Sequence, residues 1–166
     1  MGFFSCVKYL ATTGLLGFIV GRILPKRWFK ADAFPYREYT FECGGRFYHK
    51  MKIRSWQNKL PDMSRILPWC MPPKRLPGKW DAGVLIDMIR ETCVAEIVHI
   101  AHAIAGFGCL ILWDGLGGVV MAFLTAVGNL PFVLVQRYNR PRFQKLLERE
   151  RSFHKNQGVI STEITV

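Results

Sequence analysis

The sequence predicts an all-α membrane protein with about three transmembrane helices, a cytoplasmic amphipathic helix and a Pro-rich loop. Half of the 166 residues are hydrophobic, yet the chain carries a net charge of +11. The apolar residues gather in three runs, at about 3–24, 95–112 and 116–135, and a helix of such length crosses the roughly 30 Å core of a bilayer. A disordered chain needs low hydrophobicity and a small disulfide scaffold needs paired cysteines, so the composition argues against both.

The first run, Phe3 to Leu24, is apolar except for Lys8, Arg22 and a few small polar residues. A cleaved signal peptide is the alternative interpretation. The run is long for a signal peptide, and no small-residue cleavage site precedes Pro25. The sequence therefore favours an uncleaved membrane anchor.

The second and third runs are joined by a short turn around Asp114, which makes them a helical hairpin within a single integral membrane domain spanning 1–166. Fourteen Lys and Arg lie between Lys26 and Arg90 and seven from Arg137 onward, whereas the turn has none. Lys and Arg in short flanking segments stay on the cytoplasmic side. We therefore expect a multi-pass protein of the cell membrane with its amino terminus outside. The segment 25–94 and the tail 136–166 would be cytoplasmic, with their charge facing anionic lipid rather than nucleic acid.

The cytoplasmic middle segment divides into four parts. Polar and aromatic residues alternate from Tyr36 to Glu42, as in a short strand or extended stretch. Arg46 to Leu60 has the pattern of a basic amphipathic helix, which lies either in the headgroup region or against the rest of the protein. Leu67 to Gly78 contains four prolines and is expected to be a loop. Asp81 then begins a helix that leads into the second span.

Polar side chains form a stripe near the cytoplasmic end of each hairpin helix. Thr92, Glu96 and His99 are spaced by four and three residues on the second span, which puts them on one face, and His102 lies one turn deeper. On the third span the corresponding stripe consists of Asn129, Gln136 and Arg140. Because the connecting turn is short, we expect the two stripes to face each other across a shared pocket.

Such a pocket suits acyl transfer. A carboxylate that orients a neutral imidazole makes a general base, and the guanidiniums of Arg137, Arg140 and Arg142 suit phosphate or an oxyanion. Two alternatives stay open for Glu96 and His99. They are a structural hydrogen bond between helices, or half of a di-iron site, although no second Glu-x-x-His is present. The arginines have their own alternative role, as an anchor at the lipid headgroups.

The sequence contains the blocks Glu91-Thr92, Ala95-Glu96-Ile97-Val98-His99, Asn129-Leu130-Pro131 and Val135-Gln136-Arg137-Tyr138-Asn139-Arg140-Pro141-Arg142, together with Trp56, Lys59-Leu60-Pro61-Asp62 and Lys74-Arg75-Leu76-Pro77. In these blocks and their order the chain resembles the glycosyl-4,4'-diaponeurosporenoate acyltransferase family of small bacterial membrane enzymes. The resemblance implies that a fatty acyl group is esterified to a sugar hydroxyl of a glycosylated carotenoid.

We therefore expect an acyltransferase that uses acyl-CoA or acyl carrier protein as co-substrate, with no metal or further cofactor. It would act on a hydroxyl of a lipid-like glycoside, with His99 as base and Glu96 as its orienting carboxylate. The predicted substrate-binding residues are Asn129, Gln136, Arg137, Asn139, Arg140, Arg142, Trp56, Lys59 and Asp62.

Two other functions are the alternatives. One is a non-enzymatic membrane assembly module that binds anionic lipid, with Gly14, Gly17 and Gly21 as a face for self-association into a homo-oligomer. The other is a metal-dependent membrane enzyme.

Overall fold

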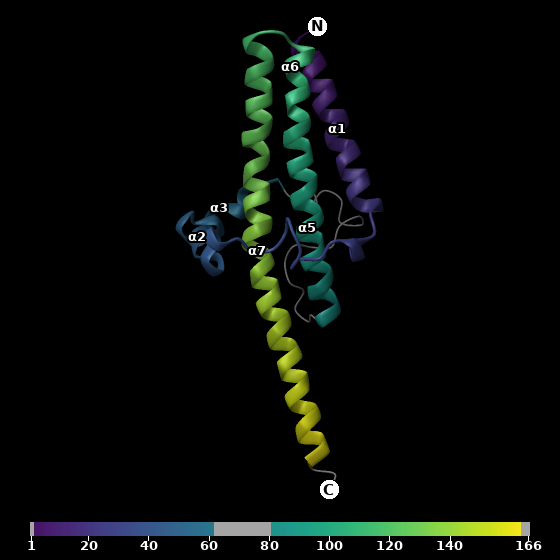
Figure 1. Cartoon of the computed structure of the whole chain (residues 1–166), viewed down its shortest axis with the longest axis vertical. Helices are drawn as coiled ribbons and strands as arrows, with labels where there is room; N and C mark the ends of the chain where they lie inside the picture. Colours follow the sequence, from purple (N-terminus) through teal and green to yellow (C-terminus); the bar gives the residue numbers. More distant parts are fainter. Residues whose placement is uncertain (1, 62–80, 164–166) are drawn as a thin grey trace.

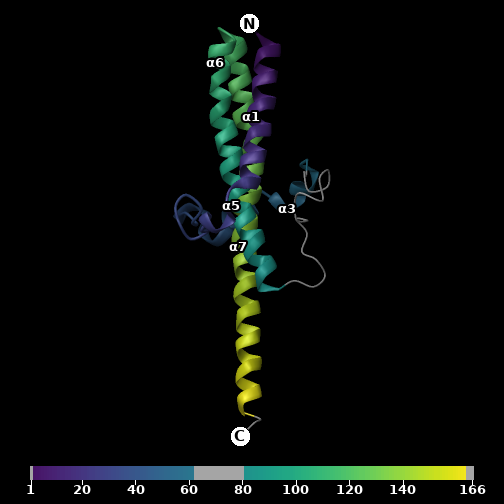
Figure 2. The same ribbon diagram turned by 90° about the vertical axis from the view of Figure 1, so that its right-hand side faces the viewer.

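The computed structural model describes residues 2–61 and 81–163, and the elements it contains in these ranges are all helical. Three long helices, α1 (Phe3–Ile23), α5 (Ala82–Ala105) and α7 (Leu116–Glu163), lie side by side (Figures 1 and 2). Each contains a stretch long and apolar enough to cross a membrane, and in the second case the stretch continues to Leu112. The prediction of an all-α membrane protein with three spans is confirmed.

Helix α1 packs along α5 through its small residues. A Cβ placed at Gly21 would lie 3.0 Å from Val98 Cγ2, and one at Gly14 would lie 3.4 Å from the His102 ring. Close approach of two helices therefore depends on the glycines. This corrects the expected self-association face, because the glycines are used within the chain.

Helix α5 begins where the sequence indicates. Asp81 is its N-cap, and the Asp81 carboxylate accepts a hydrogen bond of 2.8 Å from the backbone N–H of Val84. At its other end α5 passes through a 3₁₀ turn, Gly106–Gly108, into the short helix α6 (Cys109–Leu112). A turn with Gly115 at φ +77° then leads into α7. This turn lies at the same end of the molecule as the amino terminus (Figure 1).

Helix α7 is longer than the third apolar run. Its 48 residues include Pro131 and Pro141, and at a rise of about 1.5 Å per residue it is about 70 Å long. The tail expected as a separate segment after residue 135 is thus largely a continuation of the same helix. The carboxyl-terminal end of α7 extends beyond α1 and α5 (Figure 1).

The described part of the segment between α1 and α5, which ends at residue 61, is irregular. It contains the 3₁₀ helices Lys26–Trp28, Thr40–Gly45 and Gln57–Lys59 and the short helices α2 (Arg46–Lys50) and α3 (Ile53–Trp56). The expected extended stretch from Tyr36 to Glu42 is instead a turn that enters the second 3₁₀ helix. The Pro-rich loop and Asp62 lie outside the described residues.

The amphipathic helix expected from Arg46 to Leu60 is broken at Lys52, whose φ is +52°. The reason lies in what the segment buries. Tyr48 and Ile53 both pack on Val135 and Tyr138 of α7. Five residues of a continuous helix turn a side chain through about 140°, so both can reach α7 only if the helix is interrupted. The segment packs against the protein, which was one of the two alternatives for it.

Candidate active site

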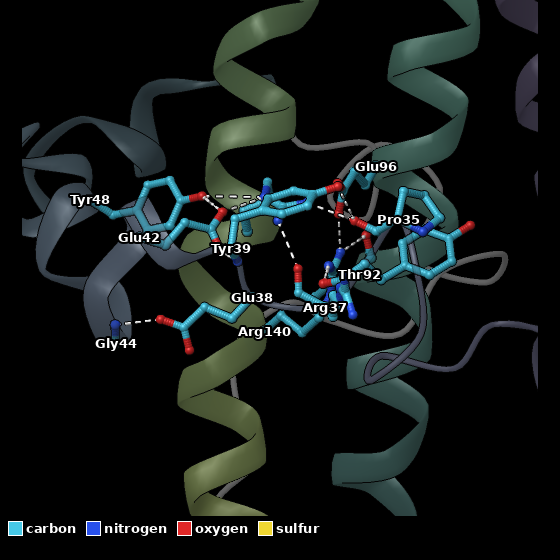
Figure 3. A network of polar contacts seen from close by, with 12 residues as sticks. Pro35, Arg37, Glu38, Tyr39, Glu42, Gly44, Tyr48, Thr92, Glu96 and Arg140 are labelled. Atoms are coloured by element: carbon cyan, nitrogen blue, oxygen red, sulfur yellow. Dashed lines mark hydrogen bonds and ion pairs between the residues drawn. The ribbon is translucent and has the colours of Figure 1, made fainter.

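The two polar stripes face each other between α5 and α7, as the sequence predicts. Arg140 of α7 donates to the Thr92 hydroxyl of α5 over 3.0 Å and to the Thr92 carbonyl over 3.2 Å. The Arg140 nitrogen that donates to this carbonyl, Nη2, also forms an ion pair with Glu96. Figure 3 shows these contacts crossing from one helix to the other. A short turn between two antiparallel helices fixes their register, which is why this pairing was predictable.

Glu96 lies at the centre of this contact and is 1% exposed. Its second carboxylate oxygen lies 2.6 Å from Nη1 of Arg137. Both oxygens thus bind guanidiniums, whereas the sequence analysis assigned Glu96 to orienting His99. Glu96, Arg137 and Arg140 can be buried together because the negative charge of Glu96 is paired with both guanidiniums.

Arg137 and Arg140 also bind the loop of residues 35–42, which lies between α1 and α5 in the sequence. Arg137 donates from Nε to Glu42 Oε1 over 2.6 Å, and from its terminal nitrogens to the carbonyls of Pro35 and Arg37 over 3.2 and 3.1 Å. Arg140 Nη1 donates to the carbonyl of Tyr36 over 2.7 Å. We call Glu42, Glu96, Arg137 and Arg140 the ion-pair cluster; it fastens the loop to both helices.

Glu42 is the loop's charged contribution to the cluster and is 3% exposed. Burial raises the pKa of its carboxyl, but hydrogen bonds from Arg137, from the Tyr48 hydroxyl and from the backbone N–H of Tyr39 outweigh burial and keep that pKa below its usual value. Burial and the hydrogen bond to Glu42 raise the pKa of Tyr48. Both groups therefore keep their ordinary charge states at neutral pH, the carboxyl ionised and the phenol protonated.

The ion-pair cluster leaves Arg137 and Arg140 with a different role from the predicted one. Their donors point to carboxylates and backbone carbonyls of the chain itself, and Arg140 is 3% exposed. Each guanidinium also lies over an aromatic ring, Arg137 at 4.5 Å from the centre of Tyr39 and Arg140 at 5.4 Å from that of Tyr36. These two arginines hold the loop and the two helices together.

His99 lies deeper along α5, with Asn129 of α7 beside it. The distance between His99 Nδ1 and Asn129 Oδ1 is 2.9 Å, and the imidazole stacks on Phe132 with ring centres 4.5 Å apart and planes 10° from parallel. Asn129 Nδ2 donates to the Thr125 carbonyl over 2.8 Å. Because a carbonyl accepts only from the amide nitrogen, Asn129 presents its oxygen to His99. The proton of a neutral His99 is thereby held on Nδ1, which makes Nε2 the basic nitrogen.

His102 extends this chain of contacts to a third helix. Its Nε2 lies 3.1 Å from the Leu10 carbonyl of α1, which requires a proton on Nε2, and its Nδ1 lies 3.5 Å from Asn129 Nδ2. Each hydrogen-bond donor thus meets an acceptor along the whole series of contacts, from the Leu10 carbonyl through His102 and Asn129 to His99. Asn129 therefore contacts the His99 imidazole, where a contact from Glu96 was expected.

An apolar groove runs between α5 and α7 next to Asn129. Its volume is about 210 Å³, and its lining residues are Ile100, Ala103, Ile104, Phe107, Ala126, Asn129, Leu130 and Val133. All but Asn129 are apolar, so the groove suits a hydrocarbon chain. Because Asn129 both lines the groove and contacts His99, the groove lies beside the imidazole.

The other predicted site residues surround the contact between the middle segment and α7. Gln136 is buried on α7, and Asn139 Nδ2 donates to Gln57 Oε1 over 3.3 Å. Arg142 lies over the Tyr138 ring at 4.8 Å. Trp56 packs on the cluster of Tyr48, Ile53, Val135 and Tyr138, and Lys59 is exposed at the end of its 3₁₀ helix. Asp62 is outside the described residues.

Glu42, Tyr48 and the loop carbonyls were not among the site residues predicted from the sequence. Glu42 and Arg137 are separated by 95 positions, and spacing within a helix carries no information about a loop that distant. One feature of the sequence could have indicated Glu42. Arg137 and Arg140 carry two positive charges on one helix, whereas Glu96 supplies only one negative charge opposite them, so a second acidic residue was to be expected nearby. Across residues 2–61 and 81–163, there is no group of three or more His, Cys, Asp or Glu side chains arranged to hold a metal ion.

Most of the chain is similar to known proteins. The family described as glycosyl-4,4'-diaponeurosporenoate acyltransferase matches residues 25–149. Proteins of that name from the Staphylococcus aureus strains USA300, NCTC 8325 / PS 47 and Newman are each 28% identical over 147 residues, which is 87% of this chain and 87% of each relative. No solved structure matches the chain significantly.

Proposed function

Because the chain belongs to the glycosyl-4,4'-diaponeurosporenoate acyltransferase family, we propose that this acyltransferase moves a long fatty acyl group from an activated thioester to a sugar hydroxyl of a carotenoid glycoside. The observation that carries the proposal is the contact between His99 and Asn129 beside the apolar groove. It combines a base of defined tautomer with a binding site for hydrocarbon.

His99 Nε2 acts as the general base in this proposal. It takes the proton of the sugar hydroxyl as that oxygen attacks the carbonyl carbon of the thioester. The carbon–sulfur bond then breaks, and the departing thiolate receives the same proton from His99. Asn129 keeps the imidazole in the required tautomer and orientation throughout, because its oxygen accepts from Nδ1–H.

The groove between α5 and α7 supports a hydrocarbon substrate. Its outer wall includes exposed apolar residues such as Ile104, Phe107 and Leu130, which in a transmembrane helix hairpin would contact lipid. A polyene or an acyl chain can therefore enter sideways from the bilayer. A soluble donor would approach from the cytoplasmic end, which is the end of α5 at Asp81.

The lopsided distribution of Lys and Arg supports the orientation. The amino terminus and the turn at Asp114 would face outward, and the middle segment and the end of α7 would face the cytoplasm. A small lipid-binding module without catalysis is less favoured, since it does not need a tautomer-fixed imidazole next to an apolar groove.

Product analysis in cells tests the proposed function. The chain would be expressed in a bacterial strain that makes a glycosylated carotenoid but does not acylate it. We expect a new, less polar pigment whose mass increases by one fatty acyl group and which alkali converts back to the glycoside. Unchanged pigment, with the protein present in the membrane at normal abundance, would contradict acyl transfer to this acceptor.

A further inference from the structure

A second and larger groove lies beyond the ion-pair cluster, towards the carboxyl end of α7. Its volume is about 590 Å³, which is within the range of about 300–1,000 Å³ for small-molecule sites. Four cations from three separate segments line it: Arg27 and Lys30 follow α1, Arg90 is on α5, and Arg151 is on α7. We call it the basic groove.

The floor of the basic groove is apolar. Phe29, Ile89 and Leu147 are each at most 9% exposed and line it. One wall is fixed by the hydrogen bond of 3.1 Å from Gln144 Nε2 of α7 to Asp32 Oδ1. Asp32 and Glu148 also line the groove, so its four cations exceed its two carboxylates. An apolar floor under a rim of net positive charge suits a ligand that joins a flat or aliphatic part to phosphates, because guanidinium and ammonium groups bind phosphate oxygens.

The basic groove and the apolar groove lie along one seam between α5 and α7. Ile89 and Ile100 line the two grooves on α5, and Gln144 and Val133 do so on α7. Each pair is eleven residues apart, close to three full helical turns, and therefore lies on one face of its helix. The ion-pair cluster lies between the grooves, about 14 Å of helix separating Arg90 from His99 at 1.5 Å per residue.

We propose that the basic groove binds the nucleotide phosphates of a coenzyme A thioester. This inference rests on the proposed function, which requires an activated acyl donor, and it replaces Arg137 and Arg140 as the phosphate-binding residues. The phosphates and nucleotide occupy the groove, and the long flexible arm of the coenzyme carries the thioester along the seam to His99. A concave site of this size takes a small nucleotide, whereas a carrier protein docks on an open surface.

Binding of coenzyme A itself tests the site without any transfer reaction. Wild-type protein would be placed in nanodiscs of uncharged phosphatidylcholine, and binding of radiolabelled coenzyme A would be measured. The triple variant Arg27→Gln, Lys30→Gln, Arg151→Gln removes three exposed cations of the groove. We expect its affinity to fall about tenfold or more, since hydrogen bonds to charged groups are among the stronger ones.

A matched control removes the same charge elsewhere. Lys50, Arg54 and Arg149 are also exposed, and none of them lines the groove. Their triple replacement by Gln should leave affinity within twofold. Equal losses in both triple variants, or no binding by the wild type, would overturn the assignment of the groove. Binding that vanishes when phosphatidylglycerol replaces phosphatidylcholine would also overturn it, because a lipid headgroup would then be the occupant.

A phosphate-free donor separates this inference from the proposed function. Transfer from an acyl N-acetylcysteamine thioester should be equal in the wild type and the groove variant, since that donor lacks the nucleotide. Normal coenzyme A binding with no transfer from either donor would refute the proposed function and leave the groove assignment standing. Transfer from the phosphate-free donor without coenzyme A binding would do the reverse.

Discussion

Replacing Glu96 with glutamine should strongly destabilise the protein, because it removes the negative charge between two buried guanidiniums. The side chains of Glu96, Arg137 and Arg140 are 2%, 10% and 3% exposed. Breaking a buried ion pair by removing one partner costs about 3–5 kcal/mol. Arg137 keeps its ion pair with Glu42 after the substitution, so we expect a loss near the lower end, at about 3 kcal/mol.

The free energy of unfolding in mixed micelles, titrated with a denaturing detergent and followed by circular dichroism, measures this loss. Glu150→Gln is the matched control, because Glu150 pairs only with the exposed His154 among its described partners, and we expect less than about 0.5 kcal/mol from it. If Glu96→Gln were as stable as the wild type and only lost activity, Glu96 would act on the reaction and the structural role would be refuted.

A double-mutant cycle with Arg140→Met adds a second test. Removing Glu96 and Arg140 together takes away both an acid and a base from the same buried contact. The double variant should therefore be less destabilised than the sum of the two single variants. Simple additivity would mean that the two side chains do not interact.

Three further predictions concern the loop, the base and the groove. The pKa of Glu42 is lowered in the folded protein. The stabilisation that its carboxylate contributes is therefore fully present above the ordinary carboxyl pKa and is lost as pH falls through the lowered value. With decreasing pH, the melting temperature of Glu42→Gln should fall less steeply than that of the wild type, and an unchanged slope would contradict this. Asn129→Ala should lower kcat by roughly ten- to a hundredfold, part of the 10²–10⁴ that a positioned base supplies, and an unchanged kcat would refute the orienting role. Ala126→Trp fills the apolar groove and should slow the transfer of long acyl chains by about tenfold while sparing short ones, because only long acyl chains need the groove. An equal loss for both lengths would mean that the acyl chain binds elsewhere.

The periodicity of the helices made half of this site predictable. Thr92 and Glu96 meet Arg140 because residues four apart share a helix face and because a three-residue turn leaves little freedom in register. His99 meets Asn129 for the same reason. These contacts depend only on local geometry, which a sequence pattern encodes.

That the two stripes face each other was predictable, but whether Glu96 binds His99 or the arginines within them was not. His99 and Glu96 are three residues apart, which suggested that they bind each other, but helix packing turns Glu96 towards Arg137 and Arg140. The choice depends on the loop, whose Glu42 and backbone carbonyls complete the cluster. Contacts over about 100 positions are set by the packed fold as a whole.

The break at Lys52 shows a related limit. Arg46 to Leu60 has a helical pattern, and local preference alone favours a continuous helix. Burial of both Tyr48 and Ile53 against α7 prevails over that preference. Tertiary packing commonly decides such cases, since burying one large apolar side chain contributes about 1.5–3 kcal/mol.

The rate of acyl transfer by purified His99→Gln tests the central claim most directly. The variant would be compared with His154→Gln, which alters an exposed histidine near the end of α7, and both would be checked for wild-type helical content. We predict that His99→Gln lowers kcat by about 10²–10⁴ while His154→Gln retains the wild-type rate. A correctly folded His99→Gln protein that transfers acyl groups at full rate would contradict the account.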